Sequence, residues 1–286
     1  MMRIAGIILF ILAVSTGEAA QKFSDIEYRR VDGESVRLDA MVPDGPGPFP
    51  IAILIHGGGW SSGDKSGSNK PGDSADITSW FAPLTGAGFT WFSINYRLAP
   101  KHPWPAGFSD VQEAIRWVKA HAAEYKGDPR RIALFGHSAG GHLACLARVL
   151  AGPDTRVQAV VGFAAVTDLE ADTMFRGGLS TSLQNLLSLP KTATPGVLAR
   201  LRELSPIAHV APGLPPFLLV HGDADKTVPY AQSLAFQQRL REGGDVCDLI
   251  TIPGAPHRLI GWETFLPHYP DLIVAWLRRE LPGGPQ

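Results

Sequence analysis

The chain of 286 residues has only two cysteines, Cys145 and Cys247, and a formal net charge of −1. Two cysteines are too few for a disulfide framework, and both stand among apolar residues typical of a buried core, so we expect no bridge. The balance of 26 basic and 27 acidic residues offers no broad cationic surface, which argues against nucleic acid as a partner. The histidines have no metal-like spacing and no His-Glu-x-x-His sequence occurs, so we expect no metal and no cofactor.

The apolar run near the N-terminus, residues 4–14, is shorter than the ~20 residues that a helix needs to span a bilayer. A basic residue precedes it and small residues stand at Gly17 and Ala19, which is the pattern of a secretory signal peptide. We therefore expect residues 1–20 to be a signal peptide cleaved after Ala19 or Ala20. The mature protein is then exported, to the periplasm or the medium, without a stable membrane anchor; an uncleaved anchor is the alternative.

Strand-like and helix-like segments alternate along residues 21–286, which we interpret as one α/β domain with a mostly parallel central sheet and helices on both faces. Alternating apolar and polar residues on either side of Asp32-Gly33 predict an antiparallel hairpin at one edge of the sheet. Further strands are expected at 49–55, 89–95, 131–135, 157–165, 215–220 and 246–252, and helices near 77–86, 108–125, 139–150, 231–241 and 272–281.

The helical pattern weakens between about 167 and 205, where leucines are interrupted by Gly177-Gly178 and Pro190. A segment of about 40 residues cannot bury an independent core of much stability. We interpret it as a small helical lid inserted over the site.

A glycine-flanked serine stands between the expected strand 131–135 and the expected helix 139–150, in the sequence Gly136-His-Ser-Ala-Gly140. A serine on so tight a turn has strained backbone angles, and side chains two residues away on either side would collide unless they were glycine. The turn would expose the Ser138 hydroxyl and direct the N-terminus of the helix at it. Ser138 is therefore the candidate nucleophile.

Three glycines in His56-Gly-Gly-Gly-Trp60 follow the expected strand 49–55. Without side chains, such a loop can turn its N–H groups toward a developing negative charge. With the N–H of Ala139, the residue after the candidate nucleophile, the N–H groups of Gly58 and Gly59 would form an oxyanion hole. A flexible glycine loop is the alternative interpretation.

A serine nucleophile needs a base, and the base needs a carboxylate that fixes its tautomer. Loops after the last two expected strands carry Asp225 and His257, which we predict to be the acid and the base. Asp223 is nearer the strand end and would serve instead to fix a turn. His268 is the rival base, but it lies beyond the loop. His137 and His142, on either side of the serine, are expected to pack rather than to catalyse.

Together the motifs resemble those of the hormone-sensitive-lipase-like α/β-hydrolases, and most of all bacterial carboxylesterases of the acetyl- and feruloyl-esterase type. They are His56-Gly-Gly-Gly-Trp60, Tyr96-Arg-Leu-Ala-Pro100, Gly136-His-Ser-Ala-Gly-Gly141, His221-Gly-Asp-Ala-Asp225 and His257. The resemblance implies the roles given above for Ser138, Asp225 and His257. It also implies a structural clamp at Tyr96-Arg97, which fits a buried arginine that needs a carboxylate such as Asp110.

Two positions depart from the family pattern: Lys101 stands where relatives usually have glutamate, and Arg258 where they tend to have a small residue. Arg258 follows the expected base directly, so it would reshape or charge the pocket. Trp60, with Phe175 and the leucines of the lid, would form an apolar or aromatic acyl pocket, with core packing as the alternative.

The expected activity is that of a serine carboxylesterase acting on small acyl or aryl esters, esters of carbohydrates among them. An arylformamidase-like amide hydrolase uses the same site and is the first alternative. A catalytically silent ligand-binding relative of the same fold is the second.

Overall fold

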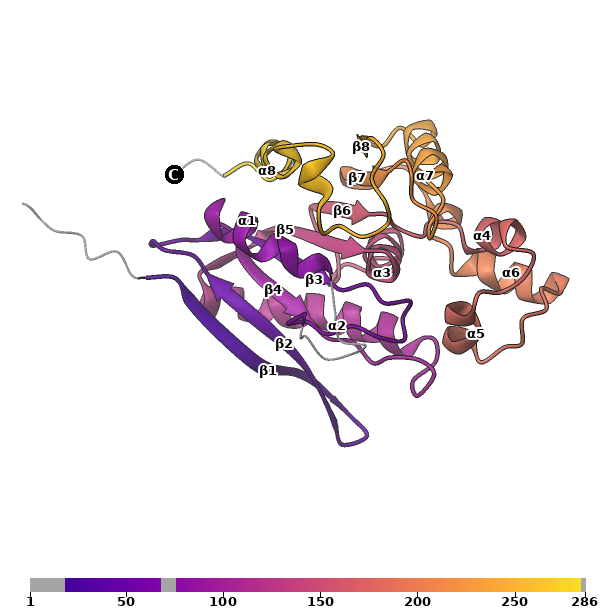
Figure 1. The fold of residues 1–286 in the computed structure, drawn as a ribbon. Coiled ribbons are helices and arrows are strands. Elements are labelled where there is room, and N and C mark those ends of the chain that lie inside the picture. The colour runs from indigo at the N-terminus through magenta and orange to yellow at the C-terminus, as the bar shows by residue number, and fades with distance from the viewer. Residues whose placement is uncertain (1–18, 68–75, 284–286) are drawn as a thin grey trace, which may run out of the picture.

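A single sheet of eight strands forms the centre of the molecule (Figure 1). The computed structural model describes residues 19–67 and 76–283, so positions 1–18 of the expected signal peptide lie outside the described part. The strand order is β1-β2-β4-β3-β5-β6-β7-β8; β2 pairs antiparallel with both β1 and β4, and all other neighbouring pairs are parallel. The strands are β1 (Gln21–Val31), β2 (Glu34–Val42), β3 (Phe49–Ile55), β4 (Thr90–Ile94), β5 (Gly127–His137), β6 (Ala159–Phe163), β7 (Phe217–Gly222) and β8 (Cys247–Ile252). This is the mostly parallel α/β architecture that the sequence predicts.

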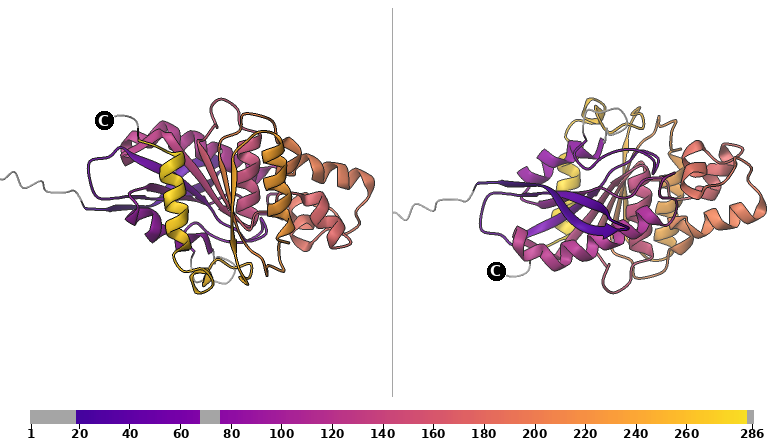
Figure 2. Two further views of the ribbon diagram at one scale, coloured as in Figure 1. Left: turned by 90° about the horizontal axis from the view of Figure 1, so that it is seen from above. Right: turned by 90° about the horizontal axis from the view of Figure 1, so that it is seen from below.

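Helices cover both faces of the sheet, as the two views of Figure 2 show. They are α1 (Phe81–Gly86), α2 (Ala106–His121), α3 (Ala139–Val149), α4 (Leu169–Phe175), α5 (Thr181–Leu187), α6 (Pro195–Glu203), α7 (Ala231–Glu242) and α8 (Tyr269–Glu280). The helix expected over 108–125 is instead α2 followed by a 3₁₀ turn, because the chain tightens at Ala122–Tyr125 and then turns at Lys126 in the left-handed region. The segment 77–86 likewise begins as the 3₁₀ helix η1 (Asp76–Trp80).

Alternation along β3 divides the apolar residues between two cores. Ile51, Ile53 and Ile55 lie in the core shared with α2, α3 and α7, whereas Ala52 and Leu54 lie in the core shared with α1 and α8. A strand buried on both faces has no need of polar residues, which explains the continuous apolar run in the sequence. Burial on both faces makes the carboxyl ends of β3 and β5 a rigid base for the loops that follow them.

The segment between β6 and β7 folds into the three helices α4, α5 and α6, which extend to one side of the sheet (Figure 1). Each begins at a capping side chain: Asp168, Ser180 and Thr194 accept hydrogen bonds from the third residue along. Short capped helices separated by glycine and proline explain why no long helical pattern appears here. Among the described helices, none has the length and apolar character needed to span a bilayer.

Candidate active site

Ser138 lies on the sharp turn between β5 and α3, with φ 55° and ψ −118°. Its N–H donates to the carbonyl of Phe163 on the neighbouring strand, at 2.9 Å, which holds the turn against the sheet. The strained angles match those of a nucleophile elbow, in which the serine is lifted clear of the strand ends. The first N–H groups of α3, beginning with that of Ala139, directly follow Ser138 and have no intrahelical acceptor.

Close packing explains the glycines around the turn. A Cβ on Gly136 would collide with the carbonyl oxygen of Gly140, and a Cβ on Gly140 would collide with the carbonyl oxygen of Ile55. Neither collision can be relieved by a rotamer change, because the obstructing atoms belong to the backbone. The glycines of the motif therefore allow the elbow to form, as the sequence reasoning expects.

The glycine loop after β3 lies against the elbow, since a Cβ on Gly57 would come within 3.3 Å of the Ser138 Cβ. Gly58, Gly59 and Trp60 all have positive φ, of 112°, 58° and 58°. Within the described part of the chain, the N–H groups of Gly58 and Gly59 donate to no protein acceptor. Unused donors beside the serine are what an oxyanion hole requires.

Trp60 lines the pocket with part of its ring and is otherwise buried. Its indole N–H donates to Nδ1 of His142 at 3.2 Å, and Nε2 of His142 donates to the carbonyl of Leu204 at 2.8 Å. The His142 imidazole is therefore neutral, and burial lowers its pKa to about 4. His142 thus packs behind the glycine loop and does not line the pocket. This position fits the expectation that it packs rather than catalyses.

Asp225 and His257 lie together, with His257 Nδ1 donating to Asp225 Oδ2 at 2.6 Å. The bond leaves Nε2 of the imidazole for a proton from Ser138, and Ser138 and His257 line the same cavity. Among the described residues, the Ser138 hydroxyl makes no hydrogen bond of its own. In unliganded sites such contacts often tighten only when substrate binds.

Asp225 is fully buried, and four donors surround its carboxylate. The N–H groups of Thr227 and Val228 donate to Oδ1, and His221 donates to Oδ2 at 3.1 Å beside His257. Burial acts to raise the pKa of Asp225, but the hydrogen bonds from His221 and His257 outweigh it and lower the pKa. The carboxylate therefore stays ionised, as an orienting acid must. Sequence reasoning missed the role of His221, because only the fold shows that its ring turns back toward Asp225.

The rival residues lie elsewhere. Asp223 accepts a hydrogen bond from the N–H of Gly254 at 2.6 Å, so it joins the loop after β7 to the loop after β8. His268 stands at the start of α8, 86% exposed, beside Asp271 at 3.3 Å. Neither residue lines the cavity that contains Ser138.

A cavity of about 380 Å³ opens over Ser138. The glycine loop 57–60 and the elbow form its floor, and the segment of α4 and α5 contributes a wall that includes Asp172, Leu183 and, directly after α4, Arg176. Phe175 is 75% exposed and is absent from the lining, so the prediction that it shapes an acyl pocket is wrong. The cavity is instead lined by Asp172, three residues before Phe175, and by Arg176, directly after it. Both side chains are charged, so the apolar pattern of the sequence gave no sign that they line the cavity.

Arg176 connects this wall to the acid loop, the segment 223–230 between β7 and α7 that carries Asp225. Its Nε donates to Asp172 Oδ2 at 2.8 Å, and its Nη2 donates to the carbonyl of Thr227. Thr227 in turn donates its N–H to the carboxylate of Asp225. The helices between β6 and β7 are thus joined through three residues to the predicted catalytic acid.

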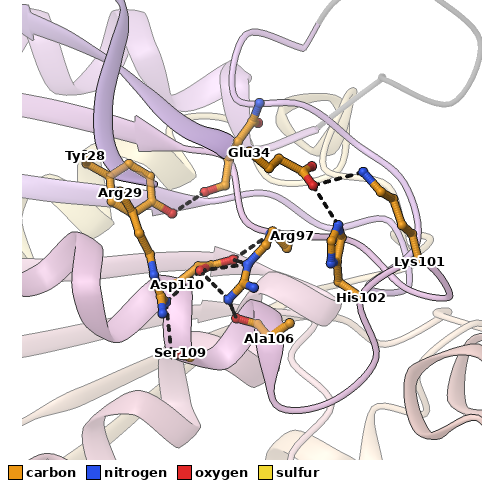
Figure 3. Close-up of polar contacts among 10 residues, drawn as sticks. Tyr28, Arg29, Glu34, Arg97, Lys101, His102, Ala106, Ser109 and Asp110 are labelled. Atoms are coloured by element: carbon orange, nitrogen blue, oxygen red, sulfur yellow. Dashed lines mark hydrogen bonds and ion pairs between the residues drawn. The ribbon is translucent and has the colours of Figure 1, made fainter. Parts of the chain in front are cut away.

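The clamp that the resemblance implies is present, and Figure 3 shows its Arg29, Arg97 and Asp110 side chains. Asp110 is fully buried and accepts hydrogen bonds from the Arg97 side chain at 2.9 Å and from Arg29 at 2.7 Å. The Tyr96 hydroxyl donates to the carbonyl of His56 at 3.0 Å. The clamp therefore supports the start of the glycine loop.

Within the described residues, no group of His, Cys, Asp or Glu has the geometry of a metal site, and both cysteines are free.

The fold and this arrangement of side chains define an α/β-hydrolase. The family model BD-FAE matches residues 38–240, and the chain belongs to this hormone-sensitive-lipase-like family, which confirms the resemblance drawn from the motifs.

Known relatives agree with this assignment. The probable carboxylic ester hydrolase LipM of Mycobacterium tuberculosis is 36% identical over 68% of this chain and 46% of its own length. Esterase LipC of the same organism is 34% identical over 73% of this chain and 53% of its own. The chain thus spans about half the length of the curated relatives that it matches.

Solved structures match over almost the whole chain. Apo esterase 2 of Thermogutta terrifontis has a TM-score of 0.73 and 26% identity, and the match covers 92% of this chain and 96% of that one. An acetyl ester-xyloside bifunctional hydrolase from Caldicellulosiruptor lactoaceticus also has a TM-score of 0.73 and 26% identity, with 90% and 96% covered.

Proposed function

We propose that the protein is a serine carboxylesterase that hydrolyses small acyl or aryl esters, esters of carbohydrates among them. The observation that supports this most directly is that one cavity of about 380 Å³ is lined by Ser138, by His257 and by the residues of the glycine loop whose N–H groups are unused. The names of the relatives, esterases and carboxylic ester hydrolases, support the same bond type.

In the proposed mechanism His257 takes the proton of the Ser138 hydroxyl as its oxygen attacks the ester carbonyl carbon. The N–H groups of Gly58, Gly59 and Ala139 stabilise the oxyanion of the tetrahedral intermediate. The bond to the alcohol breaks, and the leaving oxygen takes the proton from His257. Water then attacks the acyl-enzyme by the same route and releases the acid, while Asp225 stabilises the imidazolium that forms in each step.

The size and lining of the cavity support small substrates. Val166, Leu183 and Val228 provide apolar contacts, and Ser182 and Thr227 provide hydroxyl groups. A cavity of this volume is at the low end of those that bind small molecules, so short acyl chains are expected to react faster than long ones.

The test is covalent labelling of the purified protein with a fluorophosphonate probe, followed by mass spectrometry of the labelled peptide. We expect the label on Ser138 and none in Ser138→Ala or His257→Ala. A panel of nitrophenyl esters of increasing acyl length, run beside a formyl-anilide, then assigns the bond type. Labelling elsewhere, or hydrolysis of the formyl-anilide in preference to every ester, would contradict the proposal.

Export is the second part of the proposal. The sequence pattern of residues 1–20 supports it, and N-terminal sequencing of protein recovered from the periplasm or medium of an expressing bacterium tests it. We expect the mature chain to begin at Ala20 or Gln21. Recovery of full-length protein from the cytoplasm alone would contradict it.

A further inference from the structure

The backbone around His257 is held from two directions. His137 Nε2 donates to the carbonyl of His257 at 3.0 Å, so one contact comes from the elbow itself. Two residues further along, the N–H of Leu259 donates to Asp76 Oδ2 at 3.0 Å. The backbone of the predicted base is therefore anchored at its own carbonyl group and again two residues later.

Asp76 also binds the side chain next to the base. The Arg258 guanidinium donates to Asp76 Oδ1, at 2.7 Å from Nη2 and 3.2 Å from Nε. Asp76 is 7% exposed, whereas the Arg258 side chain is 62% exposed. The charge that Arg258 brings to the pocket is thus paired with an opposite one. A single carboxylate accepts from both the backbone and the side chain of the segment that follows His257.

The element that carries Asp76 is firmly attached to the core. Asp76 is the first residue of η1, and the same element buries Ile77 and Trp80 completely or nearly so. The Trp80 ring packs on Phe135 of β5 and Phe163 of β6, with ring centroids 5.6 and 5.2 Å apart. These two strands also position Ser138. Asp76 therefore connects the His257 loop to the same part of the sheet that carries the nucleophile.

We propose that Asp76 is a positioning residue for the base, which acts through the Leu259 N–H and the Arg258 side chain to keep the His257 imidazole in reach of Ser138. The inference rests on the proposed function, since it assigns the base of that same site. Without Asp76, the loop after β8 still has, among the described residues, the His137 contact, the His257–Asp225 hydrogen bond and the contacts at Gly254 and Trp262, but it loses the anchor that directly follows His257. A displacement of about 1 Å in a catalytic group lowers turnover by about a hundredfold.

The first experiment compares Asp76→Ala and Asp76→Asn with the control Asp128→Ala, on the full chain with a short-chain nitrophenyl ester. Asp128 is a matched control, because it is equally buried and likewise binds a backbone N–H and arginine side chains, but at the start of β5 away from the cavity. We expect Asp76→Ala to lower kcat by about ten- to a hundredfold with little change in KM, since the glycine loop, the elbow and the wall from α4 and α5 remain around the cavity. Asp76→Asn keeps one oxygen for the Leu259 N–H and is expected to lose less.

Asp128→Ala is expected to lower the melting temperature as much as Asp76→Ala while leaving kcat within about twofold. Equal kcat losses in the two alanine variants would overturn the proposal, because stability alone would then explain them. A rise in KM with kcat unchanged would also overturn it and would make Asp76 or Arg258 a substrate contact.

A double-mutant cycle with His257→Ala tests the route of the effect. A residue that acts only through His257 has nothing left to position once the imidazole is gone, so Asp76→Ala should not lower the residual rate further. An equal loss in both backgrounds would overturn the proposal.

A spectroscopic measurement separates this inference from the proposed activity. The proton between His257 Nδ1 and Asp225 gives a far-downfield proton NMR signal when the ring is held in place. We expect a sharp signal in the wild type and in Asp128→Ala, and a broadened or shifted one in Asp76→Ala. An unchanged signal in Asp76→Ala would overturn the proposal even if no ester were hydrolysed, whereas a changed signal without hydrolysis would contradict the proposed function alone.

Discussion

Asp225 illustrates how much of the site depends on single side chains. Its two carboxylate oxygens accept from two imidazoles and two backbone N–H groups, so its geometry is overdetermined. Such a carboxylate fixes the tautomer of the His257 ring without changing its own protonation.

Replacement of this carboxylate provides the first prediction. Asp225→Asn should lower kcat by about 10⁴-fold, because the amide favours the wrong His257 tautomer while the fold persists. Steady-state kinetics with a nitrophenyl ester measure the loss, and circular dichroism checks the fold. Asp223→Asn, at the neighbouring acid, should keep kcat within about tenfold, since it loses only a loop contact. A larger loss in Asp223→Asn than in Asp225→Asn would reverse the assignment.

His142 provides a prediction on pH. Its folded pKa, lowered to about 4 by burial, lies below the unfolded value of about 6.5, so the unfolded chain binds more protons between these values. The stability that the neutral ring contributes is therefore complete above about pH 6.5 and falls as the pH falls toward 4, by about 2 kcal/mol between pH 7 and pH 5. Urea unfolding at both pH values measures this.

The matched comparison is His142→Leu, which is expected to lose about 2 kcal/mol less than the wild type between pH 7 and pH 5. An equal loss in both proteins would mean that protonation of His142 does not contribute. His137, whose pKa burial and the charge of His257 also lower to about 4, contributes in the same direction and remains in both proteins.

At the scale of elements, the helices between β6 and β7 depend on a few polar contacts as well as on their buried leucines. Arg176 joins α4 to the acid loop, and it is the one hydrogen-bond partner that the Asp172 carboxylate has among the described residues. The other oxygen of Asp172, Oδ1, is buried without a partner. The attachment of the wall to the site is therefore concentrated at one guanidinium.

Arg176→Ala should release this attachment. Loss of the partner leaves the nearly buried Asp172 carboxylate unpaired, which favours local opening of α4, and we expect kcat/KM to fall by about tenfold. Hydrogen exchange of residues 169–175 should become faster in the variant. The control is Arg202→Ala on α6, whose solvent-exposed guanidinium pairs with Glu170 and is expected to contribute little to stability. Unchanged exchange in Arg176→Ala would contradict this role.

At the scale of the whole molecule, the N-terminal hairpin is tied to the domain through Asp110 (Figure 3). Arg29 comes from β1, Arg97 from the loop after β4, and Asp110 from α2, so one buried carboxylate joins three parts of the chain. Lys101, which departs from the family pattern, belongs to a more exposed pair with Glu34 on the same hairpin.

Asp110→Ala should lower the free energy of unfolding by about 3–5 kcal/mol, because it leaves partly buried guanidinium groups without a partner. Urea denaturation measures the change. Glu34→Ala removes the contacts with Lys101 and His102, which are exposed to solvent, and should cost about 1 kcal/mol or less. Similar losses in the two variants would contradict the importance of burial at Asp110.

The order of strands and helices could be predicted from the sequence, because apolar alternation and turn residues are local properties of the chain. The structure confirms the hairpin at Asp32-Gly33, the buried run of β3 and the helices on both faces. The sequence did not predict the ends of the helices in the same way. The 3₁₀ turns at 76–80 and 122–125 were not foreseen, because a turn of either helix type fits the same apolar spacing.

By itself the sequence determined where the chain turns sharply and which residue types stand there. Gly136 and Gly140 are required by steric crowding around Ser138, and the Gly-x-Ser-x-Gly spacing makes this requirement visible in the sequence. Only the tertiary structure decided which distant side chains meet: Asp76 with Arg258, Arg29 with Asp110, and Arg176 with the acid loop. It also decided that Phe175 faces solvent. The physical reason is that a backbone conformation depends on adjacent residues, whereas an ion pair 182 positions apart depends on how the whole sheet brings its loops together.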